Sequence, residues 1–197
     1  MSSLYEEAIA AVAGLFDAAR AAGEPEPAAM TLATAAIDGR VSARIVLLKQ
    51  IDVRGFAFYT NYDSAKAHQL EENSSAAVCI LWKTLNDIVQ VRAEGVVGKV
   101  AAAESDAYFA SRIRPSQIGA WASRQSQTLA SRAELDARVA EFERKFDGVP
   151  VPRPPHWGGY CLVPEMIELW YGQRARLHER VCYEIVDGAW SKRLLYP

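Results

Sequence analysis

Short apolar runs joined by tight-turn signals are the feature that most limits how this chain can fold. Asp-Gly pairs stand at 38–39 and 187–188, each between two runs rich in β-branched and aromatic residues. The four runs are Met30–Ile37 and Val41–Gln50, then Arg176–Val186 and Ala189–Leu195. Asp-Gly in this setting is a strong signal for a two-residue β-hairpin, and hairpin strands are antiparallel. The sequence therefore predicts a mainly antiparallel sheet.

Further strands and helices complete the expected fold. The additional strands are Phe56–Thr60, Ala76–Trp82 and Ile88–Val97. Helices are expected at residues 3–21, about 63–73, 104–112 and, behind a capping box that begins at Ser131, up to Phe146. The expected fold is α+β but mainly β, with six or more mostly antiparallel strands curled into a barrel and helices at its periphery. Residues 1–197 are expected to form one domain, with the helices of about 104–146 as an insertion beside the barrel.

Composition and motif searches argue against several classes of function. The chain has 22 basic and 24 acidic residues and a formal net charge of −2, which gives no support for nucleic-acid binding. The sequence starts without the pattern of a signal peptide, and no apolar run approaches the roughly 20 residues of a membrane span, so a cytoplasmic protein without membrane contact is expected. The histidines and cysteines lack metal-ligand spacing, so no metal site is expected. Dinucleotide, P-loop and nucleophile-elbow fingerprints are also missing.

Cations and hydroxyls cluster at two places in the first half of the chain. Arg44 and Lys49 bracket an apolar run, and they lie on opposite faces of a strand unless it bends. Ser64 and Lys66 stand at the start of the expected short helix, where free backbone N–H groups suit a phosphate. Plainer interpretations are rim residues that cap a core strand, and an ordinary serine N-cap beside a surface lysine.

A third cluster accompanies the expected helix 104–112. Tyr108 and Arg112 are four residues apart and would share a helix face, and Ser116 follows. Arginine offers forked donors and hydroxyls add single ones, so this cluster suits a second phosphate. Residues 117–126 mix amides, hydroxyls and one tryptophan without clear periodicity, and they are either a binding loop or a connector. Together the clusters point to a phosphorylated cofactor and a phosphorylated substrate.

The segment Trp170–Arg180 carries the remaining candidate residues. Arg176, His178 and Arg180 alternate along the expected strand 176–186, and alternate residues of a strand share one face. Two guanidinium groups and an imidazole on one face would suit an anionic, planar partner. The alternative is a solvated edge strand, where charges are common.

Motifs spread over most of the chain resemble the pyridoxine/pyridoxamine 5′-phosphate oxidase family. They are Arg44–Lys49, Phe58–Asn61, Ser64–Ala67, Arg112, Ser116–Trp121, Gln125 with Ser126, Trp157–Gly159 and Arg176–Arg180. The match runs from about residue 30 to the C-terminal Pro197. The resemblance implies a split β-barrel that forms a homodimer with FMN at the subunit interface.

The resemblance also implies a role for each matching residue. FMN would be held by Arg44, Ile45, Val46, Leu47, Leu48, Lys49, Tyr59, Thr60, Lys66, Gln90, Gln125, Ser126, Trp170 and Arg180. The substrate would be bound by Lys49, Tyr108, Arg112, Ser116, Arg176, Leu177 and His178, the first four at its phosphate. Arg176 and His178 would lie over the substrate ring as the catalytic residues.

The implied reaction is oxidation of pyridoxamine 5′-phosphate, pyridoxine 5′-phosphate or both to pyridoxal 5′-phosphate, with dioxygen as electron acceptor and hydrogen peroxide as product. Flavin would carry the redox chemistry while the protein orients the substrate. Two alternatives stay open at this point. One is a related FMN-dependent oxidase for another substrate, such as a phenazine precursor, and the other is a non-catalytic flavin or pyridoxal phosphate carrier. The presence of both Arg176 and His178 argues against the carrier.

Overall fold

A computed structural model describes residues 3–85 and 87–197 of the chain. Its strands are β1 (Ala29–Ala35), β2 (Val41–Leu47), β3 (Gln50–Asp52), β4 (Gly55–Asn61), β5 (Ser75–Trp82), β6 (Val89–Lys99), β7 (Trp157–Tyr171), β8 (Glu179–Val186) and β9 (Ala189–Leu194). Its helices are α1 (Leu4–Ala21), α2 (Ala65–Glu72), α3 (Ala102–Ser111), α4 (Arg114–Ala122) and α5 (Arg132–Lys145), with a short 3-10 turn at Arg174–Arg176. No helix in these two ranges has the length and apolarity needed to span a membrane.

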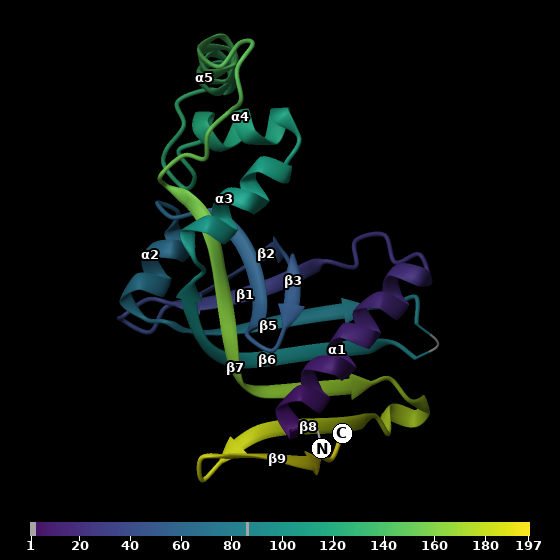
Figure 1. Cartoon of the computed structure of the whole chain (residues 1–197). Helices are drawn as coiled ribbons and strands as arrows, with labels where there is room; N and C mark the ends of the chain where they lie inside the picture. Colours follow the sequence, from purple (N-terminus) through teal and green to yellow (C-terminus); the bar gives the residue numbers. More distant parts are fainter. Residues whose placement is uncertain (1–2, 86) are drawn as a thin grey trace.

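The strands form one curled, nine-stranded sheet. Its order is β2-β1-β5-β6-β7-β4-β3, and β8 and β9 are added along β7. Every strand pair is antiparallel. The hairpins predicted at 38–39 and 187–188 join β1 to β2 and β8 to β9. The prediction of a mainly antiparallel, barrel-like sheet with peripheral helices is therefore confirmed (Figure 1).

Strand β7 holds the two parts of the sheet together. Its first half pairs with β4 and its second half with β8, while β6 runs beside both halves. A bulge between Glu94 and Gly95 of β6 lies opposite the change of partner, and a Cβ on Gly95 would lie 2.1 Å from the carbonyl oxygen of Val163. This strand is missing from the predicted set, because Gly158, Gly159 and Pro164 all weigh against a strand interior.

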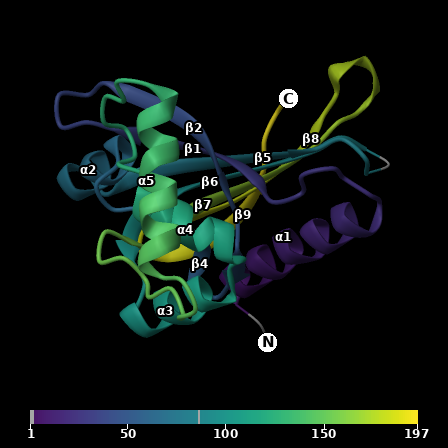
Figure 2. The same ribbon diagram turned by 90° about the horizontal axis from the view of Figure 1, so that it is seen from above.

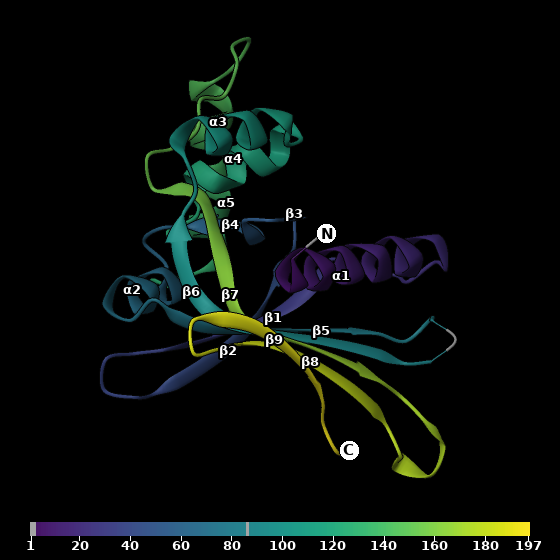
Figure 3. The same ribbon diagram turned by 60° about the horizontal axis from the view of Figure 1, so that its bottom comes forward.

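Helix α1 covers one face of the sheet and closes the main core. Ser3 and Glu6 form a capping box at its start, and the predicted stripe buries Ile9 and Val12. These side chains belong to one cluster with residues of the central strands, including Trp82, Val91 and Leu169. Figure 3 shows α1 lying across that face of the sheet. The opposite face carries exposed side chains of β2 and β5, including Ile45, Leu47 and Leu81.

Helices α3, α4 and α5 gather at one end of the molecule (Figures 1 and 2). They enclose a second small core that contains Phe109, Ile118, Phe146 and Trp157. Helix α4 includes part of residues 117–126, which were expected to be a binding loop or a connector. A proline in its first turn favours the start of a helix there. Helix α3 ends at Ser111, and Arg112 is extended with φ −73° and ψ 147°. The predicted helix is therefore one residue too long, but the side chains of Arg112 and Tyr108 both pack against Trp157, as expected for residues on one side of the helix.

Two predicted strands end or begin elsewhere. Strand β2 stops at Leu47 rather than Gln50, because the buried side chain of Leu48 and a hydrogen bond from Lys49 N to Ala57 O turn the chain into β3. The strand expected to begin at Arg176 begins at Glu179. Both corrections concern residues with expected roles in ligand binding.

Candidate functional site

A pocket of about 450 Å³ lies between the sheet and helices α3 and α4. Its lining residues are Ile45, Val46, Leu47, Lys49, Tyr59, Thr60, Lys66, Tyr108, Arg112, Ile113, Ser116, Gln125 and Trp157. The fold thus brings together the three cationic clusters that the sequence showed separately. Most of the residues expected to hold FMN or the substrate phosphate line this one pocket.

Lys66 is the cation at the base of this pocket. Ser64 caps α2 by accepting a hydrogen bond from Ala67 N, so the plain N-cap interpretation is also right. Lys66 Nζ donates to Gln125 Oε1 (2.6 Å), Thr60 Oγ1 (3.0 Å) and Ser64 Oγ (3.2 Å). Burial, with a smaller effect from the nearby charge of Arg44, lowers the pKa of Lys66 to about 8. A partly desolvated ammonium group among neutral oxygens favours an anionic ligand.

Arg112 is the second cation, and aromatic rings hold it. Its guanidinium carbon lies 4.7 Å from the ring centre of Trp157, and Tyr59 stacks on Tyr108 at 4.0 Å beside them. Nη1 of Arg112 is buried and has no hydrogen-bond partner among the described residues. Burial lowers the pKa of Arg112, the direction expected for a cation removed from water. A buried N–H without an acceptor is costly, so this nitrogen fits a ligand oxygen.

Trp157 is a site residue that sequence reasoning missed. The motif Trp157–Gly159 was noted, yet no role followed from it, because a tryptophan before two glycines gives no sign of what it contacts. The structure places its ring between Phe109 (5.1 Å) and the Tyr59 ring (5.5 Å), with Arg112 over it. The tryptophan therefore joins the helical core to the pocket wall.

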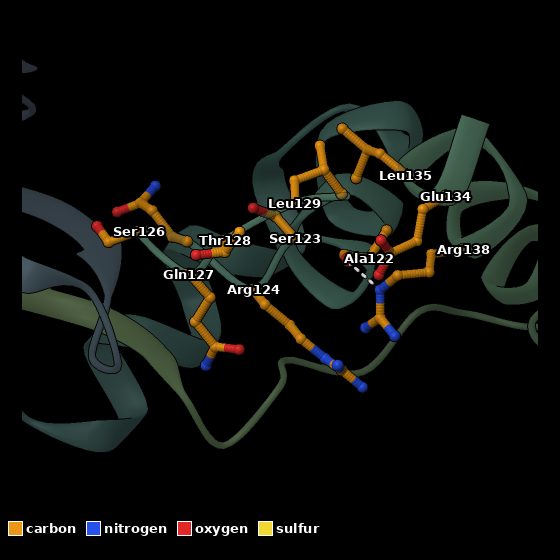
Figure 4. Close-up of a pocket in the computed structure, with 11 residues that line it drawn as sticks. Ala122, Ser123, Arg124, Ser126, Gln127, Thr128, Leu129, Glu134, Leu135 and Arg138 are labelled. Carbon is orange, nitrogen blue, oxygen red and sulfur yellow. Dashed lines mark hydrogen bonds between the residues drawn. The ribbon is translucent and has the colours of Figure 1, made fainter. Parts of the chain in front are cut away.

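The segment between α4 and α5 carries Gln125 and Ser126. Ser126 has φ 71°, an uncommon conformation for a residue other than glycine, and its Oγ accepts a hydrogen bond from Ala65 N (3.1 Å). Figure 4 shows Ser126 beside Gln127 and Thr128 at one end of a neighbouring pocket of about 230 Å³. At its other end Arg138 Nε donates to Ala122 O (2.7 Å). Ser126 therefore fixes the first residue of α2 rather than lining the main pocket.

Besides Ser126, the expected cofactor residues that lie outside the main pocket are Arg44, Leu48, Gln90, Trp170 and Arg180. Arg44 Nη1 donates to Thr34 Oγ1 (2.6 Å) and Leu32 O (3.2 Å), so its guanidinium is held against β1. Leu48 is 3% exposed and belongs to the core.

A second pocket, of about 670 Å³, lies at the far end of β7. Its lining includes Trp170, which was expected to contact FMN, and Leu177 and His178, which were expected to bind substrate. The Trp170 and His178 rings lie 4.4 Å apart, and Gln173 N donates to His178 Nδ1 (3.1 Å). A backbone N–H can only donate, so the neutral imidazole carries its proton on Nε2. His178 therefore presents an N–H group on the side away from Gln173.

The segment before β8 is a turn rather than a strand. Ala175 and Arg176 have φ values of 55° and 61°, a left-handed conformation that costs energy for residues with a Cβ. The prediction that Arg176, His178 and Arg180 share one strand face is therefore wrong, since only Arg180 lies in a strand. Strained backbone of this kind is common where a side chain has to be aimed at a ligand.

One chain does not bring all of the expected site residues together. Trp157 in the first pocket and Trp170 in the second lie near opposite ends of β7, a 15-residue strand. At about 3.3 Å per residue such a strand is on the order of 50 Å long when straight. Figures 1 and 3 show helices α3 and α4 at one end of the molecule and the turn before β8 at the other. The two groups form separate half-sites within a single subunit.

The fold and the half-sites define a class of protein: a split β-barrel with cations and aromatic rings along a pocket between its sheet and its helices. Models of two family regions match this chain. Residues 16–146 match the pyridoxamine 5′-phosphate oxidase model, and residues 157–197 match the pyridoxine 5′-phosphate oxidase C-terminal dimerisation region. The chain belongs to the pyridoxamine 5′-phosphate oxidase family of oxidoreductases.

Similar proteins support this membership over the full length. A pyridoxine/pyridoxamine 5′-phosphate oxidase of Xanthomonas euvesicatoria is 58% identical, with 100% of both chains covered. A protein of that name from Myxococcus xanthus is 55% identical over 94% of this chain and 89% of its own. The crystal structure of PhzG from Burkholderia lata, in complex with tetrahydrophenazine-1-carboxylic acid, has a TM-score of 0.90 and 34% identity over 96% of this chain and 92% of that chain.

Proposed function

We propose that this protein oxidises pyridoxamine 5′-phosphate, pyridoxine 5′-phosphate or both to pyridoxal 5′-phosphate, using FMN and dioxygen and releasing hydrogen peroxide. The observation that carries the proposal is the pocket that Lys66 and Arg112 line together, with Nη1 of Arg112 buried and without a hydrogen-bond partner among the described residues. Family membership supplies the reaction type, and relatives at 55–58% identity bear the corresponding name. Residues 1–197 are proposed to act as a single FMN-binding domain.

The residues of the first half-site fit the phosphate of FMN. Lys66 and the hydroxyl of Thr60 would hold it at the start of α2, where the backbone N–H groups add further donors. The backbone of residues 44–49 and the Gln125 amide would contact the rest of the cofactor. When bound there, FMN would supply the redox chemistry, namely hydride acceptance from the substrate and reduction of dioxygen.

Substrate residues come from both half-sites. Lys49, Tyr108, Arg112 and Ser116 would bind the substrate phosphate, and the stack on Trp157 keeps the Arg112 guanidinium in one orientation. Phosphate binding far from the reacting carbon holds the substrate in position for reaction. Arg176 would stabilise negative charge that develops on the substrate, and the Nε2–H of His178 would orient the ring or move a proton.

A homodimer would complete each site. The residues expected around one FMN lie at two ends of a single chain, so a second copy is needed to bring Gln90, Trp170 and the 176–180 segment to the first pocket. The match of residues 157–197 to a dimerisation region supports this arrangement. We propose that FMN lies at the interface of two identical subunits.

The likeness to PhzG favours one other candidate, an FMN-dependent oxidase that acts on a phenazine precursor. The two functions differ in the role of the phosphate-binding residues, because tetrahydrophenazine-1-carboxylic acid has a carboxylate and no phosphate. Arg112 and Lys49 can pair with either anion, so assays with both substrates are needed to separate the two functions. Activity on an unphosphorylated tricyclic acid in preference to pyridoxamine 5′-phosphate would support the alternative.

The test is to purify the protein, record its visible spectrum and add pyridoxamine 5′-phosphate under air. We expect a yellow protein with dissociable FMN, a dimer by sedimentation, and equal amounts of pyridoxal 5′-phosphate and hydrogen peroxide. A colourless protein that fails to bind added FMN would overturn the proposal. A flavin-loaded monomer would overturn the shared site while leaving the reaction itself open to assay.

A further inference from the structure

A buried carboxylate lies directly beside the expected FMN residues of the second half-site. Glu168 is 2% exposed, although it stands on the sheet face opposite α1, which carries exposed side chains. Its Oε1 accepts from Arg180 Nε (2.7 Å) and its Oε2 accepts from Arg92 Nη2 (3.0 Å). Neither Glu168 nor Arg92 has a role in the proposed function.

Strand register places this ion triad in a definite relation to the flavin residues. Gln90 on β6, Trp170 on β7 and Arg180 on β8 form one row across three strands. Arg92, Glu168 and Cys182 form the next row, and both rows point to the same face because residues two apart on a strand share a face. All three residues of the first row are among those expected to contact FMN. Glu168 therefore lies beside that row on the same face of the sheet.

The contacts of Arg180 leave one nitrogen for a ligand. Nε is occupied by Glu168, and Nη1 donates to Tyr196 O (2.9 Å) near the C-terminus. Nη2 has no protein acceptor among residues 3–85 and 87–197. A free arginine side chain has roughly 2 kcal/mol of rotamer entropy to lose on binding, and two fixed nitrogens remove most of that freedom in advance.

We propose that Glu168 is the positioning residue that aims Arg180 at FMN, an inference that rests on the proposed FMN-binding function. Glu168 accepts one hydrogen bond from Arg180 and one from Arg92, so its single carboxylate pairs with two guanidinium groups. Glu94 also pairs with Arg92 (3.4 Å), so the four charges balance, and the contribution of Glu168 is the geometry of Arg180, which is set before the flavin arrives. Buried ion pairs add little stability on average, which favours a positional rather than a purely stabilising role.

The pKa shifts of the triad agree with this geometry. The hydrogen bond from Arg180, followed by that from Arg92, lowers the pKa of Glu168 against the opposing effect of burial. The pKa of Arg180 is raised, first by its hydrogen bond to Glu168. Both partners are therefore charged across the neutral pH range, and the pair does not open by titration there.

The experiment measures FMN affinity of the flavin-stripped dimer by quenching of flavin fluorescence. Glu168→Gln keeps the size of the side chain but removes the charge and turns an amide N–H₂ toward one arginine. We expect FMN to bind about tenfold more weakly, which corresponds to about 1.4 kcal/mol. Glu168→Asp keeps the charge, but its side chain is too short to reach both arginines, so we expect it to weaken FMN binding as well. This variant replaces Glu168→Gln in the experiment if the glutamine variant does not fold.

Glu94→Gln is the matched control. Glu94 is also on β6 beside the triad and pairs with Arg92 (3.4 Å), but it is half-exposed and does not touch Arg180. We expect its FMN affinity to stay within about twofold of wild type. Thermal melting of the flavin-free variants checks that the fold is intact.

A double-mutant cycle separates positioning from a general structural role. Arg180→Leu should weaken FMN by itself, and adding Glu168→Gln to it should cause little further loss, because the residue on which Glu168 acts is gone. Equal losses in both backgrounds would overturn the inference, as would wild-type affinity in both Glu168 variants. Wild-type protein that binds no FMN would instead overturn the proposed function, so the two failures are distinguishable.

Discussion

Arg112→Met should raise the stability of the flavin-free protein and weaken binding of the substrate phosphate. The reason lies in the buried Nη1, which has no acceptor among the described residues. Burying a polar group without a partner costs about 1–3 kcal/mol. The contact of the Arg112 guanidinium with the Trp157 ring (4.7 Å) stabilises the fold by about 0.5–2 kcal/mol. A methionine thioether against the same ring would retain part of this stabilisation.

The substitution is therefore expected to raise the free energy of unfolding and to weaken substrate binding. A net gain of about 1 kcal/mol corresponds to a melting temperature about 2–4 °C higher for a protein of this size. Loss of a charge-assisted hydrogen bond to phosphate costs about 1.5–3 kcal/mol, which is roughly a ten- to hundredfold weaker complex. Calorimetric melting of the flavin-free protein at fixed protein concentration measures the first effect. The preference of the enzyme for pyridoxamine 5′-phosphate over pyridoxamine measures the second, because only the former has the phosphate.

Arg114→Met is the control, since its guanidinium is two residues away but has acceptors. Arg114 Nη1 donates to Val149 O (3.0 Å) and Nη2 to Phe146 O (2.5 Å). Removing these bonds should lower the melting temperature and leave the preference for the phosphorylated substrate unchanged. If Arg112→Met also melts at a lower temperature and keeps the full preference, the orphaned guanidinium is not a ligand site and the reasoning fails.

Other predictions concern catalysis, pH dependence and the fold. Arg176→Leu should leave FMN bound but lower kcat and kcat/KM together by roughly ten- to hundredfold, in steady-state kinetics with flavin titration; near-normal rates would mean a merely solvated arginine. FMN affinity should fall above pH 8, because the pKa of Lys66 is lowered to about 8 and the neutral amine cannot pair with phosphate; affinity that stays flat to pH 9.5, or falls equally in Lys66→Met, would contradict this. Gly55→Ala should lower the melting temperature by at least about 4 °C, because φ is 125° and the new Cβ would lie 1.9 Å from Leu162 O; an unchanged melt would refute it.

Local signals in the sequence were enough for the hairpins, the first helix and the cationic clusters. The Asp-Gly turns act over a few residues, and the capping box of α1 involves only Ser3 and Glu6. The motif at residues 64–66 predicted a helix start with a lysine beside it, and both are present. Each of these features depends on neighbours in the chain, so no knowledge of the fold is needed to find them.

Long-range contacts decided the rest. Strand β7 contains two glycines and a proline, and it is a strand because β6, β4 and β8 supply its partners. The environment of Arg112 comes from Trp157, and that of Arg180 from Glu168, each far away in the sequence. The turn at 174–176 replaces the expected strand because pairing with β7 ends at Tyr171.

The sequence alone therefore determined which residues have the donor groups and positive charges that suit anionic ligands, because these properties belong to residue types. Only the tertiary structure decided where they meet. It gathers Lys66, Gln125 and Arg112 in one pocket, and it holds Trp170 and His178 at the other end of β7. That separation follows from strand pairing over many residues, which no local pattern encodes, and it is the physical reason to expect the complete site between two copies of the chain.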